Sequence, residues 1–498
     1  MVAHGGGGRR GRAGPDDREV RKQIGDRRMI AWFYSALKPY WTWVLLGTSA
    51  MLLGVGAELA PPWLFAIVID DVLGDGQIEL LSKIVLALLG CCAAVAVFTM
   101  IRMATMHILA QRMVYDLRLR VHSHLQKLSL SYFESNSTGD IMSRLSNDVG
   151  AVENMVSHGT DSIIGDAVRL VALVVLMLLA LPKLAFWTLI PVPLFIVAII
   201  WFGRKIRPYY EKVRDQLGEI NAHLQENITG IRVVKAFARE KHEEGLFKEA
   251  SLKYYEAYCK GVKMWTTFFP SMGFLTSLSV LAIVWFGGRM AHYGSDVTPG
   301  KLVMFLGYMQ MFYGPVRSLM GVHNMFNAAL AALARIFVVL DTKPDITDSP
   351  DATEIGRIDG RVEFDEVSFK YHTGEQVLEK VTITAEAGET VAVVGRSGAG
   401  KTSIINLIPR FYDPMSGGIR VDGVDLREMT VHSLRSQIAI VLQDTFLFDD
   451  TVRENIRYGR LASTVEEAAK AAKAAFAHEF ITEDLPDGYD TEIGERGV

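Results

Sequence analysis

A glycine-rich stretch near the end of the sequence has the residue types and spacing of a phosphate-binding loop. Residues 395–402 read GRSGAGKT and match the pattern G-x-x-x-x-G-K-[ST]. Glycines let successive backbone N–H groups curl around phosphate oxygens without a Cβ atom in the way. Lys401 offers a positive charge to the outer phosphates, and the Thr402 hydroxyl is a ligand that suits Mg²⁺. The stretch therefore predicts a nucleotide site with Mg²⁺.

The flanking residues supply the context that this motif requires, a strand before it and a helix after it. Glu389–Val394 (ETVAVV) predicts a strand, and Ser403–Tyr412 (SIINLIPRFY) predicts a helix whose N-terminus would favour an anion. The residues expected to hold the nucleotide's phosphates are Gly395, Arg396, Ser397, Gly398, Ala399, Gly400, Lys401, Thr402 and Ser403.

Upstream of this loop, the chain contains six apolar stretches long enough to cross a bilayer, which takes roughly 20 residues. They are Trp41–Ile69, Ile84–Ile101, Ile163–Leu181, Leu184–Phe202, Phe274–Phe286 extended at both ends, and Leu302–Tyr313 extended toward Leu340. Soluble helices rarely repeat such runs without a polar face, so a large soluble core is disfavoured. A cleaved signal peptide is disfavoured too, because further spans follow the first.

The distribution of charge predicts how these spans are oriented. The tail before the first span contains Arg9, Arg10, Arg12, Arg18, Arg21, Lys22, Arg27 and Arg28, whereas the first loop contains Asp70, Asp71, Asp75 and Glu79. Basic residues return at 112–144 and 204–214. The positive-inside rule then places the N-terminus, the even-numbered loops and the end of the chain in the cytoplasm, and the protein in the cell membrane.

Two long stretches between the spans, 102–161 and 204–258, mix polar and apolar residues with helical spacing. We expect them to continue the spans as helices well beyond the membrane. Gly230 interrupts the second stretch, and Asn136–Asp140 (NSTGD) interrupts the first with the spacing of a capping box. These breaks are either ordinary turns or tips that touch another domain.

Several motifs, taken in order, make the chain resemble an ATP-binding-cassette exporter half-transporter of the multidrug and lipid-flippase type. The opening strands VEFDEVSFKYHTGEQVLEKVTI, the segment VLQDTFLFDDTVRENIRYG and the segment LPDGYDTEIGERG resemble successive parts of that family's cassette. STGDIMSRLSNDV and GIRVVKAFARE resemble its two intracellular tips, which dock on the cassettes. The resemblance extends from about Met29 to the end of the sequence.

This resemblance implies further roles. It implies that Tyr371 stacks on adenine and that Gln443 senses Mg²⁺ and the attacking water. It also implies a dimer of half-transporters in the lipid bilayer, ATP and Mg²⁺ as cofactors, and an amphipathic, lipidic or drug-like substrate. From the residues alone, Tyr371 could be an edge-strand aromatic, Gln443 an ordinary strand-end residue, and Asp444 a Mg²⁺ carboxylate after an apolar run. The match around Gln443 disfavours this last interpretation.

The sequence departs from the family pattern at its end. After Lys401, no run of four apolar residues is followed by Asp-Glu, and the signature, the catalytic glutamate and the switch histidine of the family are missing. We therefore expect residues 1–498 to bind nucleotide but to be inactive in hydrolysis on their own, as a fragment or the product of a truncated gene. The alternative function is a membrane-bound nucleotide-binding protein without turnover, such as a partner subunit. The reading frame after Val498 would discriminate between the two.

The predicted fold is multi-domain. It comprises a disordered basic tail (1–28), an all-α six-span membrane domain (29–341), a linker (342–357) and the N-terminal part of an α/β P-loop domain (358–498). A net charge of -4 gives no reason to expect a nucleic-acid partner, and the three cysteines have no metal spacing. Within the spans, Glu58 is either a functional carboxylate or a hydrated interfacial one. The Met- and aromatic-rich stretch Met304–Tyr313 is either packing or a substrate surface.

Overall fold

The computed structural model describes residues 25–159, 161–293, 296–371, 374–443 and 446–494. The chain divides after Pro344 into two compact units, each described here by itself. Most of the predicted basic tail lies outside the described residues, and its last part, from Asp26, belongs to a helix. Residues 345–357 of the predicted linker belong to the second unit, where the backbone of Thr353 hydrogen-bonds to Glu428 and Thr430.

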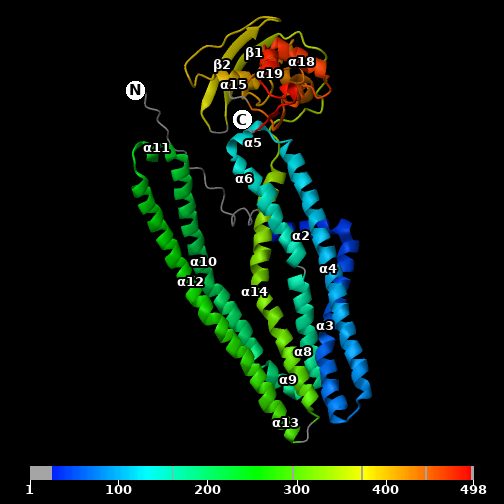
Figure 1. Ribbon diagram of the computed structural model, residues 1–498. Helices are drawn as coiled ribbons and strands as arrows, with labels where there is room; N and C mark the ends of the chain where they lie inside the picture. Colours follow the sequence, from blue (N-terminus) through cyan, green and yellow to red (C-terminus); the bar gives the residue numbers. More distant parts are fainter. Residues whose placement is uncertain (1–24, 160, 294–295, 372–373, 444–445, 495–498) are drawn as a thin grey trace. The chain divides into compact units, whose positions relative to one another are not determined.

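In its described residues, the first unit consists of helices joined by turns and short loops. Its helices are α2 (Asp26–Leu37), α3 (Trp41–Ile67), α4 (Glu79–Leu125), α5 (Leu130–Ser135), α6 (Thr138–Ser143), α7 (Val149–Asn154), α8 (Asp166–Ala180), α9 (Pro182–Leu189), α10 (Pro191–Thr229), α11 (Ile231–Ala236), α12 (Glu240–Ala282), α13 (Gly288–His292) and α14 (Pro299–Asp341). A short 3₁₀ turn, Lys38–Tyr40, joins α2 to α3, and π-helical turns continue or join the helices at Val68–Gly74, Arg144–Asp148, Met155–Gly159, Asp161–Gly165 and Ile283–Gly287. In Figure 1, α10 and α12 form a long pair that separates from α3, α4, α8 and α14 toward the α11 end.

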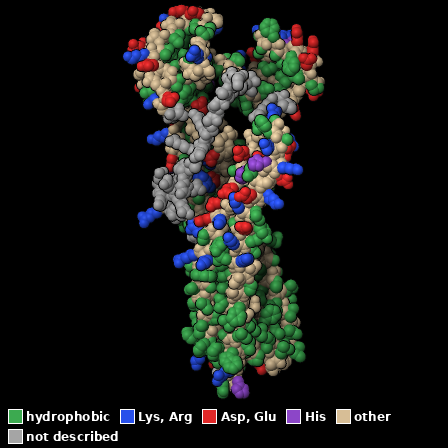
Figure 2. Space-filling view, turned by 90° about the vertical axis from the view of Figure 1, so that its left-hand side faces the viewer, with side chains coloured by type: hydrophobic (Ala, Val, Ile, Leu, Met, Phe, Trp, Pro, Cys, Tyr) green, Lys and Arg blue, Asp and Glu red, His purple; other side chains and the backbone are tan. Residues whose placement is uncertain are grey.

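Six helical stretches in the described part of the chain are long and apolar enough to cross a membrane, as the sequence predicted. In α14 the stretch that meets this criterion is Asn324–Asp341, beyond the Leu302–Tyr313 centre of the predicted sixth span, but both lie in one continuous helix. Figure 2 shows one face of this unit, on which hydrophobic side chains cover the end that carries α9 and α13 and charged side chains gather toward the other end. Large apolar side chains such as Trp201, Leu281 and Trp285 are exposed, as lipid contact requires.

The interior of the helical unit is filled by aromatic and aliphatic side chains from helices distant in sequence. Phe202 of α10 stacks on Phe268 of α12 with a centroid distance of 3.8 Å. Most of the Met- and aromatic-rich face of α14 is buried in this core, including Phe305, Met309 and Phe312. Packing is therefore the role of most of that face.

The two predicted breaks mark real helix ends. The Ser137 hydroxyl accepts a hydrogen bond from the backbone N–H of Asp140 (3.2 Å) and so caps α6. The Asp140 carboxylate in turn accepts from Arg144 (2.6 Å). Gly230 separates α10 from α11.

The second unit contains the strands β1 (Val362–Lys370), β2 (Gln376–Ala385), β3 (Ser416–Val421), β4 (Val424–Asp425), β5 (Asp450–Thr451) and β6 (Glu492–Ile493), and the helices α15 (Lys401–Leu407), α16 (Val431–Arg435), α17 (Val452–Arg457), α18 (Val465–Ala474) and α19 (His478–Glu483). Two 3₁₀ turns complete it, Leu426–Glu428 and Gly488–Asp490. One antiparallel sheet has the order β2-β1-β3-β4, and β5 pairs with β6.

The predicted strand Glu389–Val394 is wrong for this structure. No strand pairing reaches this segment among the described residues, and its chain has no regular secondary structure. A β-strand exists only through hydrogen bonds to a neighbouring strand, so apolar composition alone does not make one. The opening strands of the resemblance, in contrast, form the paired hairpin of β1 and β2.

A polar contact fixes the start of α14 against the end of α3. The Asp70 carboxylate accepts hydrogen bonds from the Thr298 hydroxyl and from the backbone N–H of Gly300, the latter at 2.8 Å. A Cβ atom at Gly300 would lie closer than 3.0 Å to the carbonyl oxygen of Ala66 and to the Asp70 side chain. This approach therefore requires glycine.

We expect Gly300→Ala to destabilise the protein by about 1–3 kcal/mol, because the added methyl group must push α14 away from α3. Gly314→Ala is the matched control in the same helix, since a methyl group added there would meet nothing within 4 Å, and it should be neutral or stabilising by up to about 1 kcal/mol. The apparent midpoint of thermal unfolding in detergent is the measurement. Equal midpoints for the two variants would contradict the contact.

Candidate nucleotide site

The glycine-rich loop lies between β2 and α15, and two of its glycines adopt backbone conformations that favour glycine. Gly398 and Gly400 have φ values of 85° and 88°, in the left-handed region that favours glycine. A Cβ atom at Gly400 would lie 2.7 Å from Cδ2 of Leu378 and 3.2 Å from the carbonyl oxygen of Val377, both on β2. Space and conformation both exclude a side chain here, so the loop backbone turns closely past β2 into α15. The sequence carried no signal for the contact with Leu378.

Lys401 is held over the loop that precedes it. Its Nζ donates hydrogen bonds to the carbonyl oxygens of Gly395 (2.9 Å) and Arg396 (2.8 Å). The N–H of Ala399 donates to the same Arg396 carbonyl (3.1 Å) and closes the turn. The ammonium group therefore lies at the loop, where its charge can meet a phosphate.

Helix α15 is shorter than the predicted helix. It begins at Lys401 rather than Ser403 and ends at Leu407 rather than Tyr412. Its buried side chains Ser403, Ile404 and Leu407 anchor it within the unit. The chain turns after Leu407, and Arg410 adopts a positive φ of 52°.

The structure brings Tyr371 to the start of this helix. The Tyr371 hydroxyl lies 2.9 Å from the Ser403 hydroxyl, and the ring packs edge-on against Phe369 and Tyr412 at centroid distances of 4.8 and 5.2 Å. Tyr371 is only half-buried. It therefore stands beside the phosphate loop, and its proposed contact with adenine remains a prediction.

Gln443 is not joined to the loop by any hydrogen bond among the described residues, and its side chain is exposed. It follows an apolar segment without strand pairing, in which Val441 is 94% exposed; Val394, just before the loop, is 88% exposed. Asp444, the alternative metal ligand, lies outside the described residues. The structure thus leaves the assignment of Gln443 as a prediction.

The residues present fit a nucleotide with Mg²⁺. Within the part of the chain that the structure describes, no group of three or more His, Cys, Asp or Glu side chains could hold a metal ion. A cation at the loop would therefore take its protein ligands from single groups such as the Thr402 hydroxyl and would depend on phosphate oxygens for the rest. The Gly400 turn and the Lys401 ammonium supply the matching cradle and charge.

Fold and site together define a membrane protein whose helical unit is followed by a P-loop unit. Comparison with known families agrees in both parts: the family model of the ABC transporter transmembrane region matches residues 44–316, and the family model described as ABC transporter matches residues 378–491.

Individual relatives are similar over most of the chain. An ATP-dependent lipid A-core flippase of Syntrophus aciditrophicus (strain SB) is 40% identical over 430 residues, which is 86% of this chain and 71% of that protein. A putative multidrug export ATP-binding/permease protein of Bacillus subtilis (strain 168) is 34% identical over 93% of this chain and 80% of that protein.

Among solved structures, a bacterial Atm1-family ABC exporter with ATP bound matches with a TM-score of 0.73 and 28% identity, covering 92% of this chain and 80% of that one. The chain belongs to the ATP-binding-cassette transporter family and has the fold of its exporters.

Gly400→Ala should weaken ATP binding by about tenfold or more, because it forces both the left-handed backbone and the contact with β2 to change. Gly356→Ala is the control in the same unit, since its Cβ position is open and its φ is not positive. Titration of each purified variant with a fluorescent ATP analogue measures the effect. Unchanged affinity in Gly400→Ala would refute the cradle assigned to this loop.

Proposed function

We propose that this protein uses ATP to export or flip amphipathic molecules across the cell membrane by alternating access. The observation that carries the proposal is a P-loop, with the Gly400 turn and Lys401 in place, on the same chain as six helices able to span a membrane. The relatives support it, because they are named as a lipid A-core flippase and a putative multidrug exporter. Lipidic and drug-like molecules are accordingly the proposed substrates.

In this proposal, each residue of the site has one task. The backbone of Gly395–Ser403 surrounds the phosphates, Lys401 neutralises the outer ones and Thr402 ligates Mg²⁺. Tyr371 stacks on adenine, and Gln443 orients water near the metal. Bound Mg-ATP supplies the free energy of phosphate transfer to water.

We further propose that the working unit is a dimer with a second half-transporter, identical or not, and that residues 1–498 alone do not turn over ATP. Hydrolysis requires a positioned water and a base or its equivalent. The sequence after Lys401 contains no apolar run followed by Asp-Glu that could provide this base. In this proposal, residues 1–498 bind ATP without hydrolysing it.

Purified 1–498 protein should bind Mg-ATP and release negligible phosphate, and Lys401→Ala should abolish binding because it removes the charge that faces the outer phosphates. ATP binding and phosphate release are measured side by side, with Gly356→Ala as the folded control. Lysine-dependent phosphate release at the rates usual for ABC pumps would contradict the assignment and would return attention to Asp444.

The N-terminus and the stretch 112–127 are proposed to face the cytoplasm, and 70–79 the outside. Asp75 and Lys127 are both exposed, so single cysteines at these positions can be tested in a background with Cys91, Cys92 and Cys259 replaced by alanine. In intact cells, an impermeant thiol reagent should label position 75 and not position 127. The reverse pattern would overturn the topology.

A further inference from the structure

An ion-pair network connects three helices inside the membrane-spanning unit. Arg169 of α8 donates from Nε (3.1 Å) and Nη2 (2.8 Å) to Oε2 of Glu58 on α3, and from Nη1 (2.7 Å) to Oδ1 of Asp166. The other oxygen of Asp166 accepts from the Ser318 hydroxyl of α14. The network therefore contains two carboxylates and one guanidinium and has a net charge of -1.

The second carboxylate, Glu58, links α3 to Arg169 of α8 and adds a negative charge that the one guanidinium does not balance. Asp166 and Arg169 form a neutral pair by themselves, and the Asp166 side chain is only 12% exposed. Glu58 is the one charged residue in the sequence of α3, and its side chain is 39% exposed. A carboxylate in a membrane helix is costly unless it is paired or functional, and here two carboxylates share one guanidinium.

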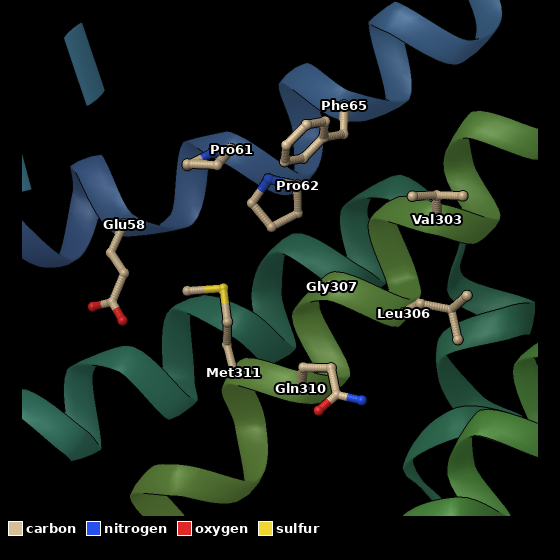
Figure 3. A pocket seen from close by; sticks show the side chains of 9 residues that line it. All are labelled: Glu58, Pro61, Pro62, Phe65, Val303, Leu306, Gly307, Gln310 and Met311. Atoms are coloured by element: carbon tan, nitrogen blue, oxygen red, sulfur yellow. The ribbon is translucent and has the colours of Figure 1, made fainter. Parts of the chain in front are cut away.

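Glu58 also lines a pocket of about 500 Å³ between α3 and α14 (Figure 3). The rest of the lining is almost entirely apolar, with Pro61 and Phe65 from α3 and Leu306 and Met311 from α14. The other polar lining group is the amide of Gln310. Such a pocket suits a ligand with a large apolar body and one polar end.

Oxygen atoms near Glu58 that lack a hydrogen-bond donor indicate which charge the polar group of the ligand would carry. Among the described residues, no hydrogen bond is made to Oε1 of Glu58, while Oε2 takes both bonds from Arg169. Pro61 and Pro62 have no N–H, so the carbonyl oxygens of Ala57 and Glu58 lack their usual helical donors. Carboxylate and carbonyl oxygens together attract a cation.

The two nearby arginines, Arg169 and Arg317, do not make the pocket favourable for an anion. Arg169 already donates from all three of its guanidinium nitrogens to the two carboxylates, so it is engaged before any anion arrives. Arg317, next to Ser318 in sequence, is directed to α12, where its guanidinium carbon lies 5.2 Å from the ring centroid of Phe269. An anionic head group would meet the net negative charge of the network instead.

We propose that this pocket binds amphipathic organic cations, with the cationic group at Glu58 and the apolar body against Phe65, Leu306 and Met311. The inference rests on the proposed export function and specifies its substrate class. It assigns Glu58 as the residue that selects for positive charge. Gly307, whose Cβ position would lie 3.0 Å from Cβ of Pro62, lets α14 come close enough to α3 to close one wall.

The test uses two probes of nearly equal size and shape and opposite charge, tetraphenylphosphonium and tetraphenylborate, with the full chain in detergent and without nucleotide. The cation should bind better than the anion, and Glu58→Gln should reduce cation binding by about tenfold or more. Glu58→Asp, which keeps the charge, should retain most of the binding. Asp166→Asn is the matched comparison: it removes the same charge from the network but leaves Glu58, the carboxylate that lines the pocket, so its loss of cation binding should be clearly smaller.

Preferential binding of the borate, unchanged binding in Glu58→Gln, or equal losses in Glu58→Gln and Asp166→Asn would each overturn the inference. The export function is measured separately, as ATP-dependent translocation of tetraphenylphosphonium and of a zwitterionic fluorescent lipid by the chain paired with a complete half-transporter. Translocation without selective cation binding would refute the pocket assignment alone. Selective cation binding without ATP-dependent translocation would refute the export function and leave the pocket.

Discussion

The absence of water in the bilayer interior is the constraint on which the helical unit depends. Backbone polar groups there must find partners within the protein, which accounts for the long helices and their exposed apolar surfaces. The same constraint makes every charged group in the spans energetically costly unless it is paired. Arg169 offsets much of the free-energy cost of placing Asp166 and Glu58 in the spans, because it forms hydrogen bonds to both carboxylates. Its bond to Glu58 also connects α8 to α3 by a polar contact that lipid cannot replace.

The second unit follows a different logic, because ATP, the ligand that its family implies, is highly charged. There the backbone itself is the recognition element. A left-handed turn at Gly400 brings the loop past β2, and Lys401 is held ready by the carbonyl oxygens of Gly395 and Arg396. The loop has this shape beside the segment Glu389–Val394, which has no strand pairing.

Similarity to relatives defines the family but leaves the chemistry of the substrate open. One relative is named for lipid A-core flipping and another for multidrug export, and both align over most of this chain. The charge of the pocket beside Glu58 is a property of this chain's own residues. It distinguishes between anionic lipids and organic cations on physical grounds, since a net negative site in a low-dielectric region repels an anion strongly.

The sequence by itself determined the six spans, the helix cap at Ser137 and the phosphate loop, because run length, capping residues and glycine spacing are local properties. It could not determine which groups would meet. Glu58 finds Arg169 across 111 positions, and Asp70 meets Gly300 across 230. The predicted strand Glu389–Val394 failed for the same reason, since pairing depends on a distant partner. Only the tertiary structure decides such contacts, because they arise from packing between elements rather than from the periodicity within one.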